Sequence, residues 1–171
     1  RWRPPDTAAM TDAVLMLSKT PAQPDRARSA PKPGHISFVG AGPGAADLLT
    51  VRAVRALAAA EVVLFDALGC AEALQFCPQA EQIPVGERAG GAATEQAFIN
   101  RLLVAQALQG KQVVRLKGGD PTVFGRLDEE IAAAVDAQID WSVVPGITAA
   151  SAAAAAAGVT LTQRGVARGV S

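Results

Sequence analysis

The chain has little of what many binding and redox sites are built from. Its 171 residues contain no tyrosine, five phenylalanines, two tryptophans, one histidine and two cysteines. So few aromatic rings leave little surface on which the bases of a single-stranded nucleic acid could stack. With His35 as the single histidine and no cysteine cluster, a zinc site is not expected. Net charge is also lacking, because 16 Lys and Arg balance 16 Asp and Glu, so the composition favours neither nucleic acid nor a membrane surface as a partner.

The two cysteines, Cys70 and Cys77, lie seven positions apart in a segment with a helical pattern. This spacing fits neither a metal motif nor a disulfide framework, so we expect two buried thiols of a reducing compartment. The longest apolar run, residues 147–161, is shorter and richer in alanine than a membrane-spanning helix, which needs about 20 strongly apolar residues. We therefore expect a cytoplasmic globular protein without a membrane segment.

Residues 1–34 differ in composition from the rest of the chain. They hold six of its 11 prolines, with arginine and lysine between them. Only residues 11–17 have a short helical pattern. Segments rich in proline and charge stay extended and flexible. We therefore expect a flexible Pro/Arg-rich leader over residues 1–34, followed by one domain.

From residue 35 onward, short apolar segments alternate with helical ones. Strands are predicted at residues 35–39, 62–65, 82–85, 112–116 and 141–144. Helices are predicted after a cap at Asp47 or Thr50, at 71–76, between a cap at Thr94 and Gly110, at 128–137 and at 147–157. Strands that alternate with helices over short connections favour an α/β fold, with a parallel-type sheet flanked by helices on both faces.

Two of the predicted helices have apolar residues at helical spacing. One set is Val51, Val54, Leu57 and Ala58, and the other is Phe98, Leu102, Ala105 and Leu108. Residues three and four positions apart lie on the same side of a helix, so both sets are expected to face the core.

Four predicted strands end in loops that suit a ligand. These ends are residues 40–44 (GAGPG), Asp66, the stretch Gly118-Gly119-Asp120, and residues 145–148 (PGIT). Glycines let a ligand approach the main chain, and the Asp-Pro step after Gly119 forces a turn. Because the carboxyl ends of parallel strands meet at one edge of a sheet, we expect the four loops to converge on one cleft.

The first of these loops also fits a dinucleotide site. GAGPGA matches G-x-G-x-x-G/A after a strand, and Asp66 could hold a ribose. Against this, Pro43 and Gly44 weaken the helix start that should receive the pyrophosphate. Asp66 also lies farther along than the usual ~20 residues. A dinucleotide-binding oxidoreductase domain therefore stays an alternative at this point.

Five motifs follow one another between residues 35 and 165: VGAGPGAADLLTVRAVRAL, VVLFDAL, VGERAG, VVRLKGGDPTVFGR and VVPGITAASAA. Together they resemble the tetrapyrrole methylase family, and within it the uroporphyrinogen-III C-methyltransferases of sirohaem and cobalamin biosynthesis. The resemblance implies C-methylation of uroporphyrinogen III to precorrin-2, with S-adenosylmethionine as donor and S-adenosylhomocysteine as product. It also implies a homodimer, and a cofactor folded into a cleft between two α/β domains.

The resemblance assigns roles to residues by their place in the motifs. Cofactor contacts fall on Pro43, Gly118, Gly119, Asp120, Val123, Thr148 and Ala149. Asp66 matches the proposed acceptor of the proton that the ring loses after methylation, and a positioned carboxylate suits that task. A polycarboxylate substrate would rely on Arg88, Lys117, Arg126 and Arg164. No metal is expected, because the sulfonium of the donor is already activated.

The chain departs from the family pattern at some of these places. Glu87 stands where the family has a lysine proposed as proton donor, and Ala67 stands where it has an arginine. Family members continue with a second α/β domain that is absent from this sequence. Residues 35–160 are therefore expected to form the N-terminal domain, and residues 161–171 to begin the linker. A non-catalytic relative that binds the cofactor or a partner is a second alternative.

Overall fold

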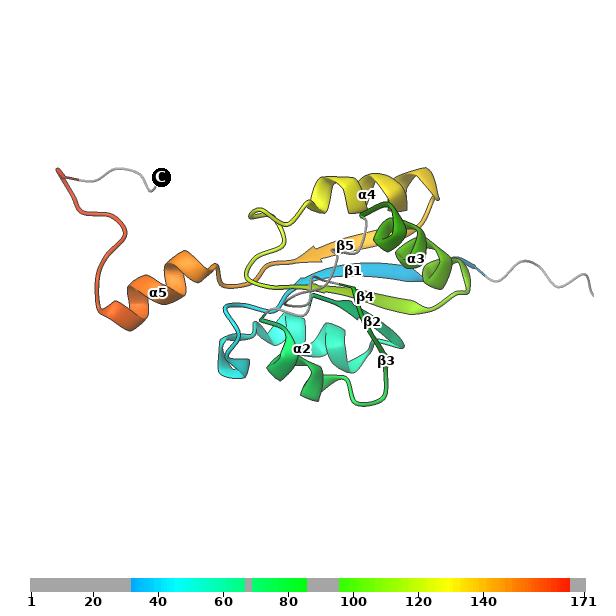
Figure 1. The fold of residues 1–171 in the computed structure, drawn as a ribbon, viewed down its shortest axis with the longest axis horizontal. Helices are drawn as coiled ribbons and strands as arrows, with labels where there is room; N and C mark the ends of the chain where they lie inside the picture. Colours follow the sequence, from blue (N-terminus) through cyan, green and yellow to red (C-terminus); the bar gives the residue numbers. More distant parts are fainter. Residues whose placement is uncertain (1–31, 67–68, 86–95, 167–171) are drawn as a thin grey trace, which may run out of the picture. The chain divides into compact units, whose positions relative to one another are not determined.

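The structure is a computed structural model that describes residues 32–66, 69–85 and 96–166 (Figure 1). The predicted leader lies almost wholly outside these ranges, and so do Glu87, Arg88 and the predicted cap Thr94. Within the described ranges, no helix is long and apolar enough to cross a membrane.

Five strands form one parallel sheet. They are β1 (His35–Gly40), β2 (Val62–Phe65), β3 (Glu81–Pro84), β4 (Gln112–Lys117) and β5 (Asp140–Val144). Their spatial order is β3-β2-β4-β1-β5, and every pairing is parallel. The predicted α/β fold is confirmed, and each strand lies within a residue or so of its predicted bounds.

The helices cover both faces of the sheet. In chain order the helical segments are the 3₁₀ helix η1 (Ala46–Leu48), α2 (Val51–Ala58), the 3₁₀ helix η2 (Ala71–Phe76), α3 (Gln96–Leu108), α4 (Leu127–Asp136) and α5 (Ala149–Ala157). Figure 1 shows α3 and α4 on one face and α2 on the other. Side chains on β4 alternate between these layers: Val114 and Leu116 pack in the core below α2, whereas Val113 packs in the core below α3 and α4.

The strand order reverses next to β1. The chain moves from β1 past the position of β4 to β2 and β3, returns to β4, and then crosses β1 to reach β5. Open α/β sheets bind ligands at such a reversal, beyond the carboxyl ends of the strands. The loops that follow β1, β4 and β5 therefore lie where the topology favours a site.

The buried faces of two helices differ from the prediction. In α2 the buried residues are Ala53 and Leu57, while Val51 is 67% exposed. In α3 the buried residues are Ile99, Leu103 and Ala107, and the predicted Phe98 and Leu108 are about half exposed. Both helices carry apolar side chains on two adjacent stripes, so spacing alone did not identify the stripe that packs on the sheet.

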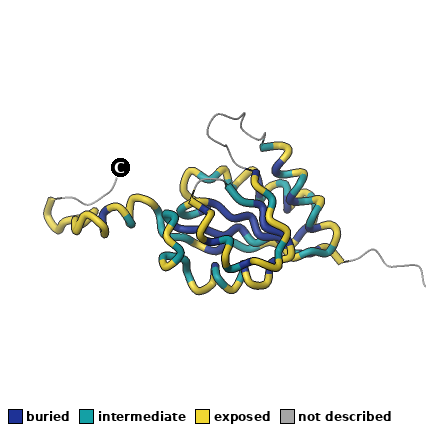
Figure 2. Tube along the Cα trace, turned by 60° about the horizontal axis from the view of Figure 1, so that its bottom comes forward, coloured by how far each residue is buried: buried dark blue, intermediate teal, exposed yellow. Residues whose placement is uncertain are grey.

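The two cysteines flank η2 as buried free thiols, which confirms their predicted place in the core. In Figure 2 the buried residues, drawn in dark blue, gather mainly in the strands of the sheet.

The last helix, α5, follows the N-cap Thr148 and ends before Gly158, whose φ of 65° is left-handed. It starts two residues later than predicted, because Thr148 caps it, and of its nine residues only Ala154 is buried.

Candidate functional site

Three strand-end loops lie together, two of them joined through their main chains and the third through a side chain. We call them the β1 loop (residues 41–44), the β4 loop (residues 118–126) and the β5 loop (residues 145–148). Gly42 and Gly119 exchange two hydrogen bonds, with N–O distances of 3.1 and 2.7 Å. The amide of Ala41 donates to the carbonyl of Lys117 at 2.8 Å. The predicted convergence is therefore confirmed for three of the four strand ends, the β1, β4 and β5 loops.

Glycine is required where the three loops meet. A Cβ on Gly146 would lie 2.1 Å from the carbonyl oxygen of Gly119, and a Cβ on Gly40 would lie 2.6 Å from the same oxygen. Real side chains do not approach so closely, so any larger residue would force the loops apart. The close approach of bare main chain gives the site a floor made of peptide groups, which we call the glycine floor: Gly40, Gly42, Gly119 and Gly146.

Asp120 fastens the β5 loop to the β4 loop. Its carboxylate accepts hydrogen bonds from the amide of Gly146 at 2.9 Å, from the amide of Thr122 at 2.8 Å and from the Thr122 hydroxyl. Burial opposes ionisation of Asp120, but these hydrogen bonds outweigh it and lower its pKa. Much of the acceptor capacity of Asp120 is thus used within the protein, which gives this residue a loop-fixing role besides the predicted cofactor contact.

The other predicted cofactor residues lie along the same edge. Gly118 is exposed, and Gly119, with φ of 66°, faces space in which an added Cβ would meet no atom within 4 Å. Val123 is 45% exposed, and Pro43 in the β1 loop is half-buried. The Thr148 hydroxyl accepts the amide of Ser151 at 3.3 Å, and its neighbour Ala149 is exposed.

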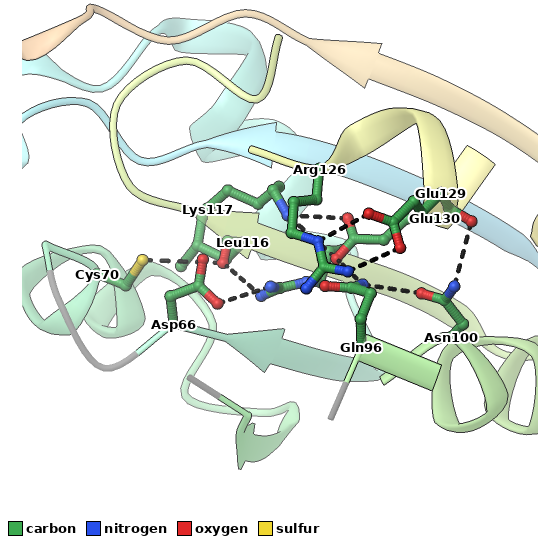
Figure 3. Close-up of polar contacts among 10 residues, drawn as sticks. Asp66, Cys70, Gln96, Asn100, Leu116, Lys117, Arg126, Glu129 and Glu130 are labelled. Carbon is green, nitrogen blue, oxygen red and sulfur yellow. Dashed lines mark hydrogen bonds and ion pairs between the residues drawn. The ribbon is translucent and has the colours of Figure 1, made fainter. Parts of the chain in front are cut away.

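Beside the glycine floor lies a buried cluster of charges: Asp66, Arg115, Lys117 and Glu130. Figure 3 shows Asp66 from the end of β2, Lys117 from β4 and Glu130 from α4 in this cluster. Arg115 Nη2 lies 2.6 Å from Asp66 Oδ1, and Arg115 Nε lies 2.9 Å from Glu130 Oε1. Lys117 Nζ lies 3.0 Å from both carboxylate oxygens of Glu130.

The members of the cluster differ in exposure. The side chains of Glu130, Arg115 and Lys117 are 0, 3 and 5% exposed, whereas that of Asp66 is 32% exposed. Burial alone would lower the pKa of Arg115, but the charges of Glu130 and Asp66 outweigh it and the pKa is raised. Burial and the charge of Arg115 lower the pKa of Lys117, against the opposing effect of Glu130.

This geometry changes the role expected for Lys117. The sequence suggested a contact with substrate carboxylates, but the ammonium is buried and held by Glu130. A direct substrate contact would require Lys117 to leave a buried partner, so we assign it to the cluster. Arg115 and Glu130 were not singled out from the sequence. The sequence did contain a signal for the cluster, because two cations at alternate positions of a buried strand lie on one face of the sheet and need an anion on the covering helix.

The end of the β4 loop carries Arg126, an exposed arginine of the predicted substrate set. Arg126 has φ of 50° and pairs with Glu129 through two bonds of 2.7 and 2.8 Å. Phe124, with φ of 53°, is fully exposed. Left-handed backbone is uncommon outside glycine, and such positions cluster at functional sites. An open depression of about 480 Å³ runs along this segment from Pro121 to Ile131. Arg164 is also exposed, beyond α5.

A protein-family model matches most of the chain. The model of the tetrapyrrole (corrin/porphyrin) methylases matches residues 35–171. This range begins at β1 and includes each of the strand-end loops described above.

Individual proteins agree with this match. The chain is 50% identical over 137 residues to a uroporphyrinogen-III C-methyltransferase of Pseudomonas aeruginosa, covering 80% of this chain and 56% of that protein. It is 54% identical over 135 residues to a siroheme synthase of Zymomonas mobilis, covering 78% of this chain and 29% of that protein. It thus spans about half the length of the methyltransferase, and less of the synthase.

Solved structures give the same result. A uroporphyrin-III-C-methyltransferase from Thermus thermophilus superposes with a TM-score of 0.69 at 44% identity, covering 77% of this chain and 56% of that one. A structure of the Thermus enzyme in complex with S-adenyl homocysteine has a TM-score of 0.66 at 42% identity, covering 80% and 57% of the two chains.

Proposed function

Because the chain belongs to the tetrapyrrole (corrin/porphyrin) methylase family, we propose that it carries the donor-binding half of an S-adenosylmethionine-dependent methyltransferase. The acceptor is uroporphyrinogen III, which is methylated on carbon to precorrin-2 in sirohaem or cobalamin biosynthesis. The names of its relatives, which include a uroporphyrinogen-III C-methyltransferase and a siroheme synthase, support this acceptor.

The observation that carries the proposal is the glycine floor. Gly42 and Gly119 bond to each other within the floor, but Gly118 beside them is exposed and the space over Gly119 is open, which suits a ligand that is bound through the main chain. S-adenosylmethionine has the amide-like edges of adenine, two hydroxyls, an ammonium and a carboxylate, and peptide N–H and C=O groups can bind all of these. Gly118, Val123 and Thr148, with Pro43, Asp120 and Ala149 beside them, are the residues proposed to hold it.

When bound, S-adenosylmethionine supplies a methyl group on a positively charged sulfur. The task of the protein is mainly to align the acceptor carbon with that methyl, an effect worth up to about 7–11 kcal/mol. Arg126 and Arg164, with Arg88 outside the described residues, are proposed to bind the carboxylates of the acceptor. A carboxylate oxygen of Asp66 then takes the proton that the ring loses.

The test uses the full-length gene product with uroporphyrinogen III and S-adenosylmethionine. We expect S-adenosylhomocysteine to be released and the mass of the tetrapyrrole to rise by one CH₂ per turnover, because the ring gains a methyl group and loses a proton. Asp66→Asn is the matched variant: it should keep its affinity for S-adenosylhomocysteine in calorimetry and lose methylation by about 100-fold or more. Binding without any methylation would favour the non-catalytic relative, and restoring lysine in Glu87→Lys would then be informative. Binding of NAD or NADP in place of S-adenosylhomocysteine would overturn the proposal.

The assembly of the protein forms part of the same proposal. The chain matches 56% of the methyltransferase and 29% of the synthase, which supports a second α/β domain that completes the cleft. In this arrangement residues 35–160 form the first domain, residues 161–171 begin the linker, and residues 1–34 are a flexible leader. We also propose a cytoplasmic homodimer. Light scattering on the full-length gene product is expected to give a molar mass of twice the monomer mass.

A further inference from the structure

Arg115 is held by three different acceptors. Nε donates to Glu130 Oε1 at 2.9 Å, Nη1 donates to the main-chain carbonyl of Leu116 at 3.1 Å, and Nη2 donates to Asp66 Oδ1 at 2.6 Å. The guanidinium is planar and rigid, so three bonds in different directions fix both its place and its plane. Of the three acceptors, Asp66 is the one that directly follows the carboxyl end of a strand, where the ligand is proposed to bind.

The anchor behind Arg115 is rigid as well. Glu130 is completely buried on α4, and besides Arg115 it accepts bonds from Lys117 Nζ at 3.0 Å and from Gln96 Nε2 at 3.2 Å. A strand and two helices thus converge on one carboxylate. These bonds hold the guanidinium of Arg115 in a fixed place relative to the sheet and to α4.

A buried ionic cluster of this kind is weak evidence for stability. Apolar residues of similar volume often make a protein as stable or more stable. The cluster therefore calls for another role, and its one half-exposed member is Asp66 at the edge of the sheet. A proton acceptor has to lie about 2.6–3.2 Å from the atom that loses the proton. An aspartate that rotates freely about χ1 and χ2 would meet this requirement only part of the time.

We infer that Arg115, anchored by Glu130, is the positioning residue that fixes the Asp66 carboxylate in its rotamer at the methylation site. Ionised carboxylates have about four lone-pair sites. The bond from Arg115 therefore orients the group and leaves acceptor capacity for the ring proton. This inference rests on the proposed function in one respect, since the proton transfer belongs to that reaction; the orientation of Asp66 does not.

The test compares two variants of the full-length gene product. Arg115→Met removes one cation from Glu130 and the partner of Asp66. Lys117→Met also removes one cation from Glu130 but no contact of Asp66, so it controls for damage to the cluster. We expect Arg115→Met to lower kcat by about 100-fold, the size of effect that a misplaced reacting group produces. Lys117→Met should lower kcat at least tenfold less. Affinity for S-adenosylhomocysteine should stay within twofold in both.

Three further measurements keep the outcome decisive. Arg115→Lys, which retains a donor, should recover part of kcat. If Arg115→Met fails to fold, the double variant Arg115→Met/Glu130→Gln removes an opposite pair of charges and takes its place. Crystal structures of the variants then show whether Asp66 keeps one rotamer in Lys117→Met and occupies several without Arg115.

The two proposals fail in different ways. Absence of methylation by the unaltered protein sinks the proposed function, while the rotamers of Asp66 still decide the positioning role. Equal losses of kcat in the two variants, or a single unchanged Asp66 rotamer without Arg115, overturn the inference itself.

Discussion

Replacing Glu130 by glutamine should cost this protein a large part of its stability. The side chain has no exposed surface and accepts hydrogen bonds from Arg115, Lys117 and Gln96. Glutamine preserves the volume and one acceptor, but it turns an NH₂ group toward cations that have nowhere to move. Removing one partner of a buried ion pair costs about 3–5 kcal/mol, and the retained acceptor puts Glu130→Gln near 3 kcal/mol. Total stabilities are only about 5–15 kcal/mol.

Urea denaturation followed by far-UV circular dichroism measures this loss. A loss of about 3 kcal/mol corresponds to a decrease in Tm of about 6–12 °C for a chain of this length. The matched control is Glu129→Gln, one position earlier on α4, where the side chain is exposed and pairs with Arg126. That variant should unfold like the unaltered protein, because exposed ion pairs contribute little.

The loss should also depend on pH through Lys117. Burial lowers the pKa of Lys117 below 10.5 in the folded protein, so between that lower value and 10.5 the unfolded chain binds more protons. Stability linked to this group therefore rises with pH. In Glu130→Gln the ammonium has lost its counter-ion, so the deficit should shrink as the pH approaches 10.5. A deficit below about 1 kcal/mol at pH 7, or one equal to that of Glu129→Gln, would refute the electrostatic account of the cluster.

Three other outcomes can be measured independently. Gly146→Ala would place a Cβ 2.1 Å from the carbonyl of Gly119, so it should weaken S-adenosylhomocysteine binding at least tenfold in calorimetry, and unchanged affinity would contradict the glycine floor. Thr50→Ala removes the N-cap acceptor of α2 and should lower the free energy of unfolding by about 1 kcal/mol in urea titrations; no change would mean that water replaces the cap. Burial raises the pKa of Cys70 to about 11, so at pH 8 its thiol should react with a disulfide reagent only after the protein unfolds in urea. Rapid reaction of the folded protein would contradict this.

Features encoded by neighbouring residues were predictable from the sequence. Strand β2 runs from Val62 to Phe65 as expected, because an apolar run bounded by polar residues leaves few alternatives. Gly158 ends α5 as expected, because a left-handed residue at a helix end is usually glycine. The convergence of the loops followed from the rule that parallel strands end at one edge.

Features that depend on distant pairings were not predictable. Arg115 meets Asp66 across 49 positions and Glu130 across 15, and no local pattern records such a meeting. Lys117 was predicted to bind substrate carboxylates, whereas in the structure its ammonium is buried against Glu130 on α4. The two apolar stripes of α3 gave no basis for choosing Ile99 over Phe98 until the sheet beneath was known.

The glycine floor and the exposed side chains near it respond differently to mutation. Peptide N–H and C=O groups are the same in every residue, so substitutions around the glycine floor leave its donors and acceptors in place as long as the glycines persist. The exposed side chains of Phe124 and Arg126 in the β4 loop are different, because a substitution there changes the chemical group that is presented. Under the proposed function, substitutions at Phe124 and Arg126 would therefore change the choice of acceptor while recognition of the donor stays constant.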